Sequence, residues 1–307
     1  MTAYLIRRIL RAVTTLLGTT LIIFLLVRVV PADPAVSIAG PKADPETLAA
    51  IRKDLGLDAP LAVQYGRYVW ALAHGDLGRS YLTGRRVSDV IAARVPATAL
   101  LGATSLGVGF VLGLVVGVGT AARRGSAIDV AVLLVTLVGL SIPVFWLGNI
   151  LIYEFSYRLK LLPLGGYGTT ANLVLPAATL GIMQFFFYAR FVHTNVAGTL
   201  ASDYIRTARA KGFAESMVVV KHAFRNACIP VITVLGLQFG QLLGGAIVTE
   251  TVFAWPGVAT LVVDSIRNQD FPVVQCAVVL LALIIVAVNF VVDMIVGFID
   301  PRIRVGA

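Results

Sequence analysis

Residues 204–230 read YIRTARAKGFAESMVVVKHAFRNACIP, and their composition differs sharply from that of the whole chain. Of the 307 residues, 58% are hydrophobic and only 13% are charged. This stretch nevertheless carries five basic residues, and long apolar runs flank it on both sides. Such a basic, helix-forming segment between apolar runs predicts a polar loop at one surface of a membrane protein. The five basic residues are Arg206, Arg209, Lys211, Lys221 and Arg225.

The apolar runs are long enough to cross a bilayer, which requires ~20 predominantly apolar residues. The charged fraction of 13% is about half of the roughly 25% that is typical of soluble domains. The last five runs contain no Asp, Glu, Lys or Arg, each of which would cost about 2.5–3.5 kcal/mol at the bilayer centre. We therefore predict an all-α polytopic membrane protein with six transmembrane helices, at residues 9–30, 97–122, 130–153, 171–189, 227–249 and 271–292.

The short loops predict the orientation of the chain, because Lys and Arg accumulate on the cytoplasmic side. If the N-terminus is cytoplasmic, twelve basic residues lie inside and three lie in the short outer loops. Both termini and residues 204–230 are therefore expected in the cytoplasm. The net charge of +9 could also suggest nucleic acid. The positions of the basic residues fit membrane topology better, so we expect no nucleic-acid partner.

The expected organisation has four parts. Residues 1–30 form the N-terminus and first span, 31–96 an external subdomain, 97–298 a five-span core with a cytoplasmic loop at 198–229, and 299–307 a cytoplasmic tail. In the external part, Asp44 precedes Pro45 at a predicted helix start, and a second helix ends at Gly75. This subdomain would present three aromatic residues to the membrane surface or to a partner: Tyr65, Tyr68 and Trp70.

Glycines recur every fourth residue in two spans, at 109, 113 and 117 and at 236, 240 and 244. Such rows allow close helix packing, either within the chain or against another membrane subunit. Few polar residues lie within the spans. Gln238 and Gln241 project from one side of the fifth span, and together with Gln184 they are the candidates for a translocation path. Hydrogen bonding between helices is the alternative role for such residues.

The sequence contains no recognisable catalytic or nucleotide-binding motif. The dipeptide Gly-Lys does not occur, which excludes the phosphate loop GxxxxGK[ST], and HExxH, GxSxG and CxxC are also absent. The three histidines, His74, His193 and His222, are too scattered for a metal site and are expected to be ordinary surface or loop residues. We therefore expect no catalytic residue, metal or cofactor, and a transporter of this kind would take its energy from another subunit.

The opening stretch has the signals of two helices joined by a corner. Ser202 and Asp203 can cap a helix over residues 204–211, and Gly212 favours the left-handed conformation that ends a helix. A second helix is predicted over residues 214–225. In a soluble protein this pattern would suggest a DNA-binding helix-turn-helix. Between membrane spans it is better interpreted as a docking element for a cytoplasmic protein.

The sequence of this loop resembles that of a known protein family. RTARAKG at 206–212, with HAFRNACIP at 222–230, is similar to the EAA loop of binding-protein-dependent ABC importer permeases, especially their peptide and nickel branch. Further motifs of that branch follow in order along almost the whole chain. They are GDLGRSYLTGRRV (75–87), RVPAT (94–98), SIPVFWLG (141–148), LKLLPLGGY (159–167), ETVFAWPGVATL (250–261) and DPRIR (300–304). Such an ordered series is far more specific than a single motif.

Three positions depart from the family pattern. Arg206 stands where the wider family has glutamate, which affects the details of docking. Ala259 and Cys276 each replace a frequent glycine, which affects local helix packing only.

The resemblance implies the type I ABC importer permease fold with six spans and a cytoplasmic coupling-helix (EAA) loop. The chain looks like the B-type permease subunit of a dipeptide or oligopeptide importer in the bacterial cytoplasmic membrane. The implied partners are a second homologous permease subunit, two cytoplasmic ATP-binding subunits, an external solute-binding protein and membrane lipid. The residues that match the ATPase-coupling segment are Tyr204, Arg206, Thr207, Ala208, Arg209, Ala210, Lys211 and Gly212.

The function implied is translocation by alternating access, coupled to ATP hydrolysis on other subunits. Relatives carry dipeptides, oligopeptides, glutathione, nickel chelates or haem, so the substrate stays open. The alternative is a self-sufficient secondary carrier or channel for a small polar solute, which predicts ionisable residues or broken helices at the membrane midplane. A membrane-bound enzyme is a third possibility, but the sequence offers no nucleophile or metal cluster for it.

Overall fold

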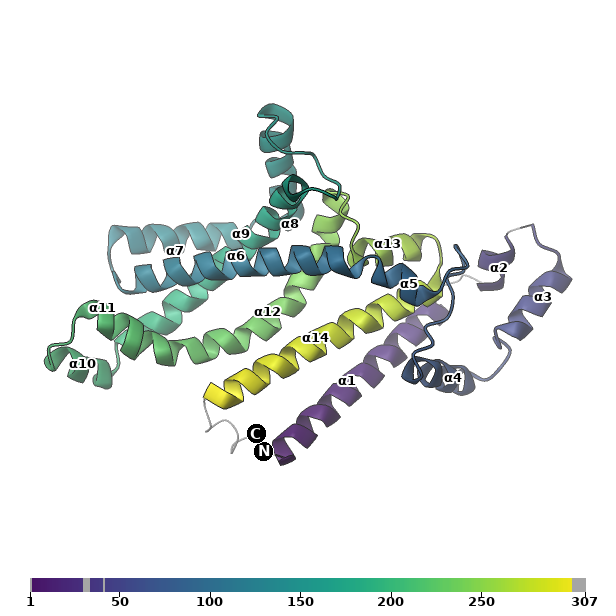
Figure 1. Ribbon diagram of the computed structural model, residues 1–307, viewed down its shortest axis with the longest axis horizontal. Coiled ribbons are helices and arrows are strands. Elements are labelled where there is room, and N and C mark those ends of the chain that lie inside the picture. Colours follow the sequence, from purple (N-terminus) through teal and green to yellow (C-terminus); the bar gives the residue numbers. More distant parts are fainter. Residues whose placement is uncertain (1, 30–33, 41, 300–307) are drawn as a thin grey trace. The chain divides into compact units, whose positions relative to one another are not determined.

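The computed structural model describes residues 2–29, 34–40 and 42–299. Within these residues the chain is helical and has no β-strand (Figure 1). The motif at 300–304 and the rest of the predicted tail lie outside the described residues. The elements are α1 (Thr2–Val29), α2 (Pro34–Ala39), α3 (Pro45–Asp54), α4 (Leu61–Ala73), α5 (Val87–Ala92), α6 (Val95–Ala121), α7 (Ala127–Leu140), α8 (Val144–Leu151), the π-helix η1 (Ile152–Arg158), α9 (Thr170–Leu200), α10 (Asp203–Ala210), α11 (Glu215–Met217), the π-helix η2 (Val218–Phe224), α12 (Arg225–Val252), α13 (Val258–Arg267) and α14 (Phe271–Ile299).

The prediction of an all-α membrane protein is confirmed. Among the described residues, five helical segments are long and apolar enough to cross a membrane, and one bent pair of helices makes a sixth candidate. The five segments are Ile6–Arg28, Val87–Ala121, Thr170–Leu200, Glu215–Val252 and Phe271–Ile299.

The third predicted span, residues 130–153, is not one continuous helix. The chain bends by 102° between Ala127–Leu140 and Val144–Arg158. Pro143 explains the break, because proline lacks an N–H donor and drives the residue before it out of helical geometry. It adopts extended backbone angles (φ −64°, ψ 136°) and becomes the N-cap of α8. The prediction of a continuous third span is therefore wrong, although the bent pair together has the length and composition of a span.

By packing, the chain divides into two compact units. Unit 1 comprises Met1–Thr98 and Pro256–Val286, and unit 2 comprises Ala99–Trp255 and Ala287–Ala307. Each unit thus combines segments that lie far apart in the sequence, and each is described separately below.

In unit 1, α4 packs against α1. The Tyr65 hydroxyl donates to the Leu17 carbonyl at 3.1 Å and lies 3.0 Å from the Thr20 hydroxyl. The Tyr65 and Tyr68 rings both pack on Phe24, with centroids 5.5 and 6.1 Å away. The sequence predicted that these two tyrosines would face the membrane surface or a partner. They do not, because their face of α4 packs against α1. The predicted helix signals are confirmed: Asp44 caps α3 through the Thr47 amide, and Gly75, with φ +76°, follows α4.

A second part of unit 1 joins α5, α13 and the first half of α14 through a common apolar core, which includes Val87, Val258 and Val273. The buried carboxylate of Asp270 ties the loop before α5 to this core. It accepts hydrogen bonds from the Ser80 hydroxyl and, at 2.9 Å, from the Tyr81 amide. Burial raises the pKa of the Tyr81 phenol. No local sequence pattern indicates this loop anchor, because Asp270 and Ser80 lie far apart in the chain.

In unit 2, α6 and α9 approach each other closely along the first glycine row. A Cβ atom added at Gly109 would lie 2.5 Å from the Gly181 carbonyl oxygen, and one at Gly117 would lie 2.7 Å from the Ala189 carbonyl oxygen. Only glycine permits this separation. The first row therefore packs within the chain. In the second row, Gly236 packs against Asn289 of α14, whereas a Cβ at Gly244 would have no described atom within 4 Å.

Candidate coupling loop and translocation pocket

The loop that was singled out in the sequence forms a short helix on the surface of unit 2. After α9 ends at Leu200, Ser202 takes extended angles at the start of α10. Two α10 side chains, Ile205 and Ala208, are buried in a cluster with Val218 and Ala223 of η2. They lie three residues apart, so they share one helix face. This apolar face fixes α10 on the segment that follows it in the chain.

The opposite face of α10 is exposed. Seven of the eight predicted coupling residues lie on it or at its end: Tyr204, Arg206, Thr207, Arg209, Ala210, Lys211 and Gly212. The eighth, Ala208, is buried, so any part it has in coupling is through packing. On α10 and at its end, the exposed side chains of the described residues include three basic groups and one acidic group, Asp203, which lies 3.6 Å from Arg206. The surface therefore offers positive charge to a partner.

Gly212 makes the corner that the sequence predicted. Its φ is +80°, in the left-handed region, and its amide donates to the Arg209 carbonyl at 2.9 Å. Arg209 spans the corner by binding Glu215 with two hydrogen bonds, of 2.6 and 3.0 Å. These bonds raise the pKa of Arg209. Both side chains are about half exposed, so this pair orients the corner more than it stabilises the fold.

The segment after the corner differs from the prediction. A separate second helix was expected over residues 214–225, but α11, η2 and α12 follow one another without a break over Glu215–Val252. No glycine lies between residues 214 and 230, and the only proline, Pro230, sits inside α12. Unlike Pro143, it does not end its helix. The exposed loop is consequently joined rigidly to a membrane helix instead of resting on a second flexible corner.

Tyr204 links α10 to the start of α12. Its hydroxyl accepts a 2.9 Å hydrogen bond from the Asn226 side chain and lies 3.4 Å from the His222 carbonyl. Beside it is a groove of about 1040 Å³ whose lining includes the basic residues Lys221 and Arg225. The loop and the groove together form one cationic surface.

The three candidate path residues meet in one place. Gln184 of α9 and Gln238 and Gln241 of α12 line a pocket of about 300 Å³. The α7–α8 break forms another wall, through Pro143 and its neighbours. The unpredicted bend at Pro143 therefore lies beside the three glutamines that were predicted to line a path. The role of these residues in translocation stays a prediction.

The chemistry of this pocket is polar but uncharged. Gln184 and Gln238 are buried, and the Gln184 Oε1 atom has no hydrogen-bond partner among the described residues. A buried amide without a partner is costly, so its free acceptor is available to a ligand donor. The described lining includes no Asp, Glu, Lys, Arg or His. This arrangement can hydrogen-bond amide or hydroxyl groups but offers no nucleophile or metal ligand set.

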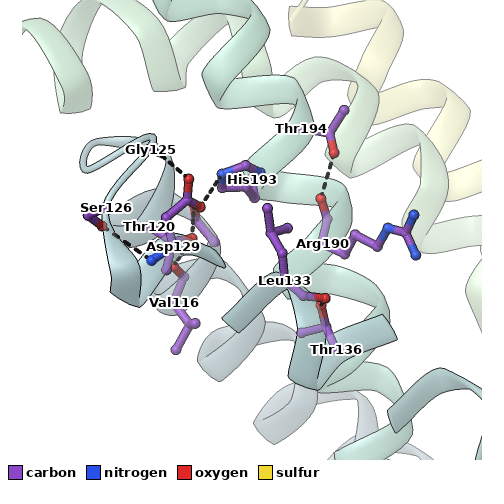
Figure 2. A network of polar contacts seen from close by, with 11 residues as sticks. Val116, Thr120, Gly125, Ser126, Asp129, Leu133, Thr136, Arg190, His193 and Thr194 are labelled. Atoms are coloured by element: carbon purple, nitrogen blue, oxygen red, sulfur yellow. Dashed lines mark hydrogen bonds and ion pairs between the residues drawn. The ribbon is translucent and has the colours of Figure 1, made fainter. Parts of the chain in front are cut away.

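One buried ionisable pair was missed by the sequence analysis (Figure 2). His193 of α9 lies with its Nε2 atom 2.8 Å from Oδ1 of Asp129, at the start of α7, and both side chains are about nine-tenths buried. Neither of these two atoms has a hydrogen-bond partner among the described residues, so the contact between ring and carboxylate is electrostatic. The other carboxylate oxygen accepts from the Gly125 amide at 2.9 Å. The expectation that His193 is a surface or loop residue is wrong, because it packs against α7.

Comparisons with known proteins place the chain among membrane transport proteins. The family described as "Binding-protein-dependent transport system inner membrane component" matches residues 109–305, and the N-terminal model of the same system matches residues 1–102. The glutathione transport system permease protein GsiC of Salmonella paratyphi A is 43% identical over 98% of both chains. A putative peptide transport system permease protein of Brucella abortus is 40% identical over 99% of both chains.

A solved structure shares the fold. The inward-facing MetNI methionine ABC transporter aligns with a TM-score of 0.58 and 23% identity, over 69% of this chain and 96% of that one. The expected type I ABC importer permease fold is thereby confirmed.

Proposed function

This chain belongs to the family of binding-protein-dependent transport system inner membrane components, and we propose that it is the permease subunit of an ATP-driven peptide importer in the bacterial cytoplasmic membrane. The substrate class is supported by the relatives, one named for glutathione, a tripeptide, and another for peptide transport. The glutamine pocket is compatible with such a substrate, because its amides can pair with peptide N–H and C=O groups. ATP is hydrolysed on separate subunits.

The complete importer contains a second, homologous permease subunit, two ATP-binding subunits and an external solute-binding protein. The exposed basic surface of α10 is the contact with an ATP-binding subunit. Both termini and the loop at 198–229 lie in the cytoplasm, in agreement with the distribution of basic residues. Residues 31–96 lie outside, where the binding protein delivers its substrate.

One observation carries the mechanism. The segment Glu215–Val252 is continuous, and it contacts α10 at one end and lines the glutamine pocket further along. When the ATP-binding subunits close, α10 moves with them, and its apolar contact with η2 passes the displacement to α12. The pocket walls then shift relative to the α7–α8 break. This change alternately opens the pocket to the two sides of the membrane.

A reconstituted importer tests this proposal. We expect uptake of a labelled dipeptide or glutathione into proteoliposomes to require ATP and both ATP-binding subunits. Lys211→Glu should weaken capture of those subunits and reduce uptake, with a larger loss at low ionic strength because the contact is exposed. The control is Lys53→Glu, an equal charge reversal at an exposed position of α3.

The outcome that contradicts the proposal is uptake by this chain alone in sealed vesicles. That result would favour a self-sufficient carrier or channel. Full capture and full uptake by Lys211→Glu would instead retain the importer but remove α10 from the coupling contact.

A further inference from the structure

A second pocket of unit 2 has features that peptide transport does not use. Its volume is about 550 Å³, and its lining comes from the loop after α6, the middle of α7 and the second half of α9. Its lining combines basic and apolar side chains, notably Arg124, Arg190, His193, Leu133, Leu134 and Leu137.

The two arginines are available for an anionic ligand. Both are exposed, and neither forms an ion pair with any described residue. The nearby carboxylate of Asp129 does not neutralise them, because its oxygens face the Gly125 amide and His193. Figure 2 shows the Arg190 side chain extending away from Asp129. Two unpaired guanidinium groups at one pocket favour a phosphate-sized anion.

The other wall of the pocket is apolar and open to the surroundings. Leu134 and Leu137 are 56% and 48% exposed and lie three residues apart, so they share one face of α7. This helix belongs to the bent pair that has the composition of a membrane span. A hydrocarbon chain can cover these leucines, whereas a soluble anion would leave them bare.

The two arginines line the pocket from different elements. Arg124 lies in the loop after α6, and Arg190 lies ten residues before the end of α9, about 15 Å along the helix. A long arginine side chain inside the apolar region extends its head toward the interface. In a bilayer, both guanidinium groups of this pocket can therefore extend toward the lipid phosphates.

We propose that this pocket binds an anionic phospholipid, with its phosphate between Arg124 and Arg190 and an acyl chain along Leu134 and Leu137. Basic pockets between membrane helices are known to bind such headgroups. The lipid would bridge α9 to the loop that begins α7, and so hold these elements together beside the Asp129–His193 pair.

Native mass spectrometry of the purified full-length chain tests the proposal. With added phosphatidylglycerol, we expect a bound lipid that zwitterionic phosphatidylcholine does not replace. Arg124→Gln and Arg190→Gln should each weaken binding about fivefold, and the double variant roughly thirtyfold. Arg123→Gln is the matched control, because Arg123 is an exposed neighbour of the same charge that does not line the pocket. Thermal unfolding of each variant verifies that the exposed substitutions leave the fold intact.

Three results would overturn the proposal. Equal binding of the two lipids, or equal losses in Arg123→Gln and the pocket variants, would leave no specific site. Complete displacement of the lipid by millimolar inorganic phosphate, with no effect of Leu134→Ser on lipid binding, would identify a site for free phosphate. Loss of the bound lipid when the chain assembles with its second permease subunit would make this pocket a subunit interface.

Discussion

At the scale of single residues, Gly212 is a position where backbone conformation, and not contact with neighbouring atoms, determines the effect of a substitution. A Cβ there would meet no described atom within 4 Å, but φ is +80°. A substitution thus adds strain of about 1–3 kcal/mol without a clash. We predict that Gly212→Val inserts normally yet lowers substrate-stimulated ATP hydrolysis of the assembled importer about fivefold or more. Gly212→Asn should retain more activity, because asparagine tolerates left-handed angles.

The matched control is Gly119→Ala in α6. This glycine also has no described atom near its Cβ position, but its φ is not positive. If Gly212→Val kept full stimulation, the corner would have no part in coupling.

At the scale of elements, we expect substitutions in the glutamine pocket to change transport without changing stability. Gln184→Leu should reduce uptake severalfold without lowering the melting temperature, because leucine replaces a buried acceptor that has no partner. Gln238→Leu combined with Gln241→Leu should also reduce uptake and leave basal ATP hydrolysis unchanged. Gln275→Leu in α14 is the control, since it does not line this pocket. Unchanged uptake in all variants would make the glutamines packing residues.

These elements also show which features could be predicted from the sequence and which could not. The basic loop, its Gly212 corner and the glutamines on one face of α12 could be predicted, because each depends on local residues. The bend at Pro143 could not be recognised within an unbroken apolar run, and Pro230 shows that a proline in such a run need not end its helix. The Asp129–His193 pair joins residues far apart in the chain, so no local sequence pattern predicts it.

At the scale of the whole molecule, the orientation predicted from basic residues can be tested by labelling. In a chain with Cys228 and Cys276 replaced by alanine, Lys53→Cys should react with an impermeant thiol reagent in intact cells, and Arg123→Cys should react only after permeabilisation. Both positions are exposed, so accessibility is limited by the membrane alone. The reverse pattern would invert the topology and place α10 outside, away from any ATP-binding subunit.

The length of the unbroken segment Glu215–Val252 makes its tilt sensitive to the thickness of the bilayer. Its 38 residues span about 55 Å, whereas the hydrocarbon core is about 30 Å thick. Roughly 25 Å of helix therefore extends beyond the hydrocarbon, and a 10° change in tilt displaces its far end by about 4 Å. Bilayer thickness sets such tilts. Lipid chain length should thus influence how tightly ATP hydrolysis is linked to uptake.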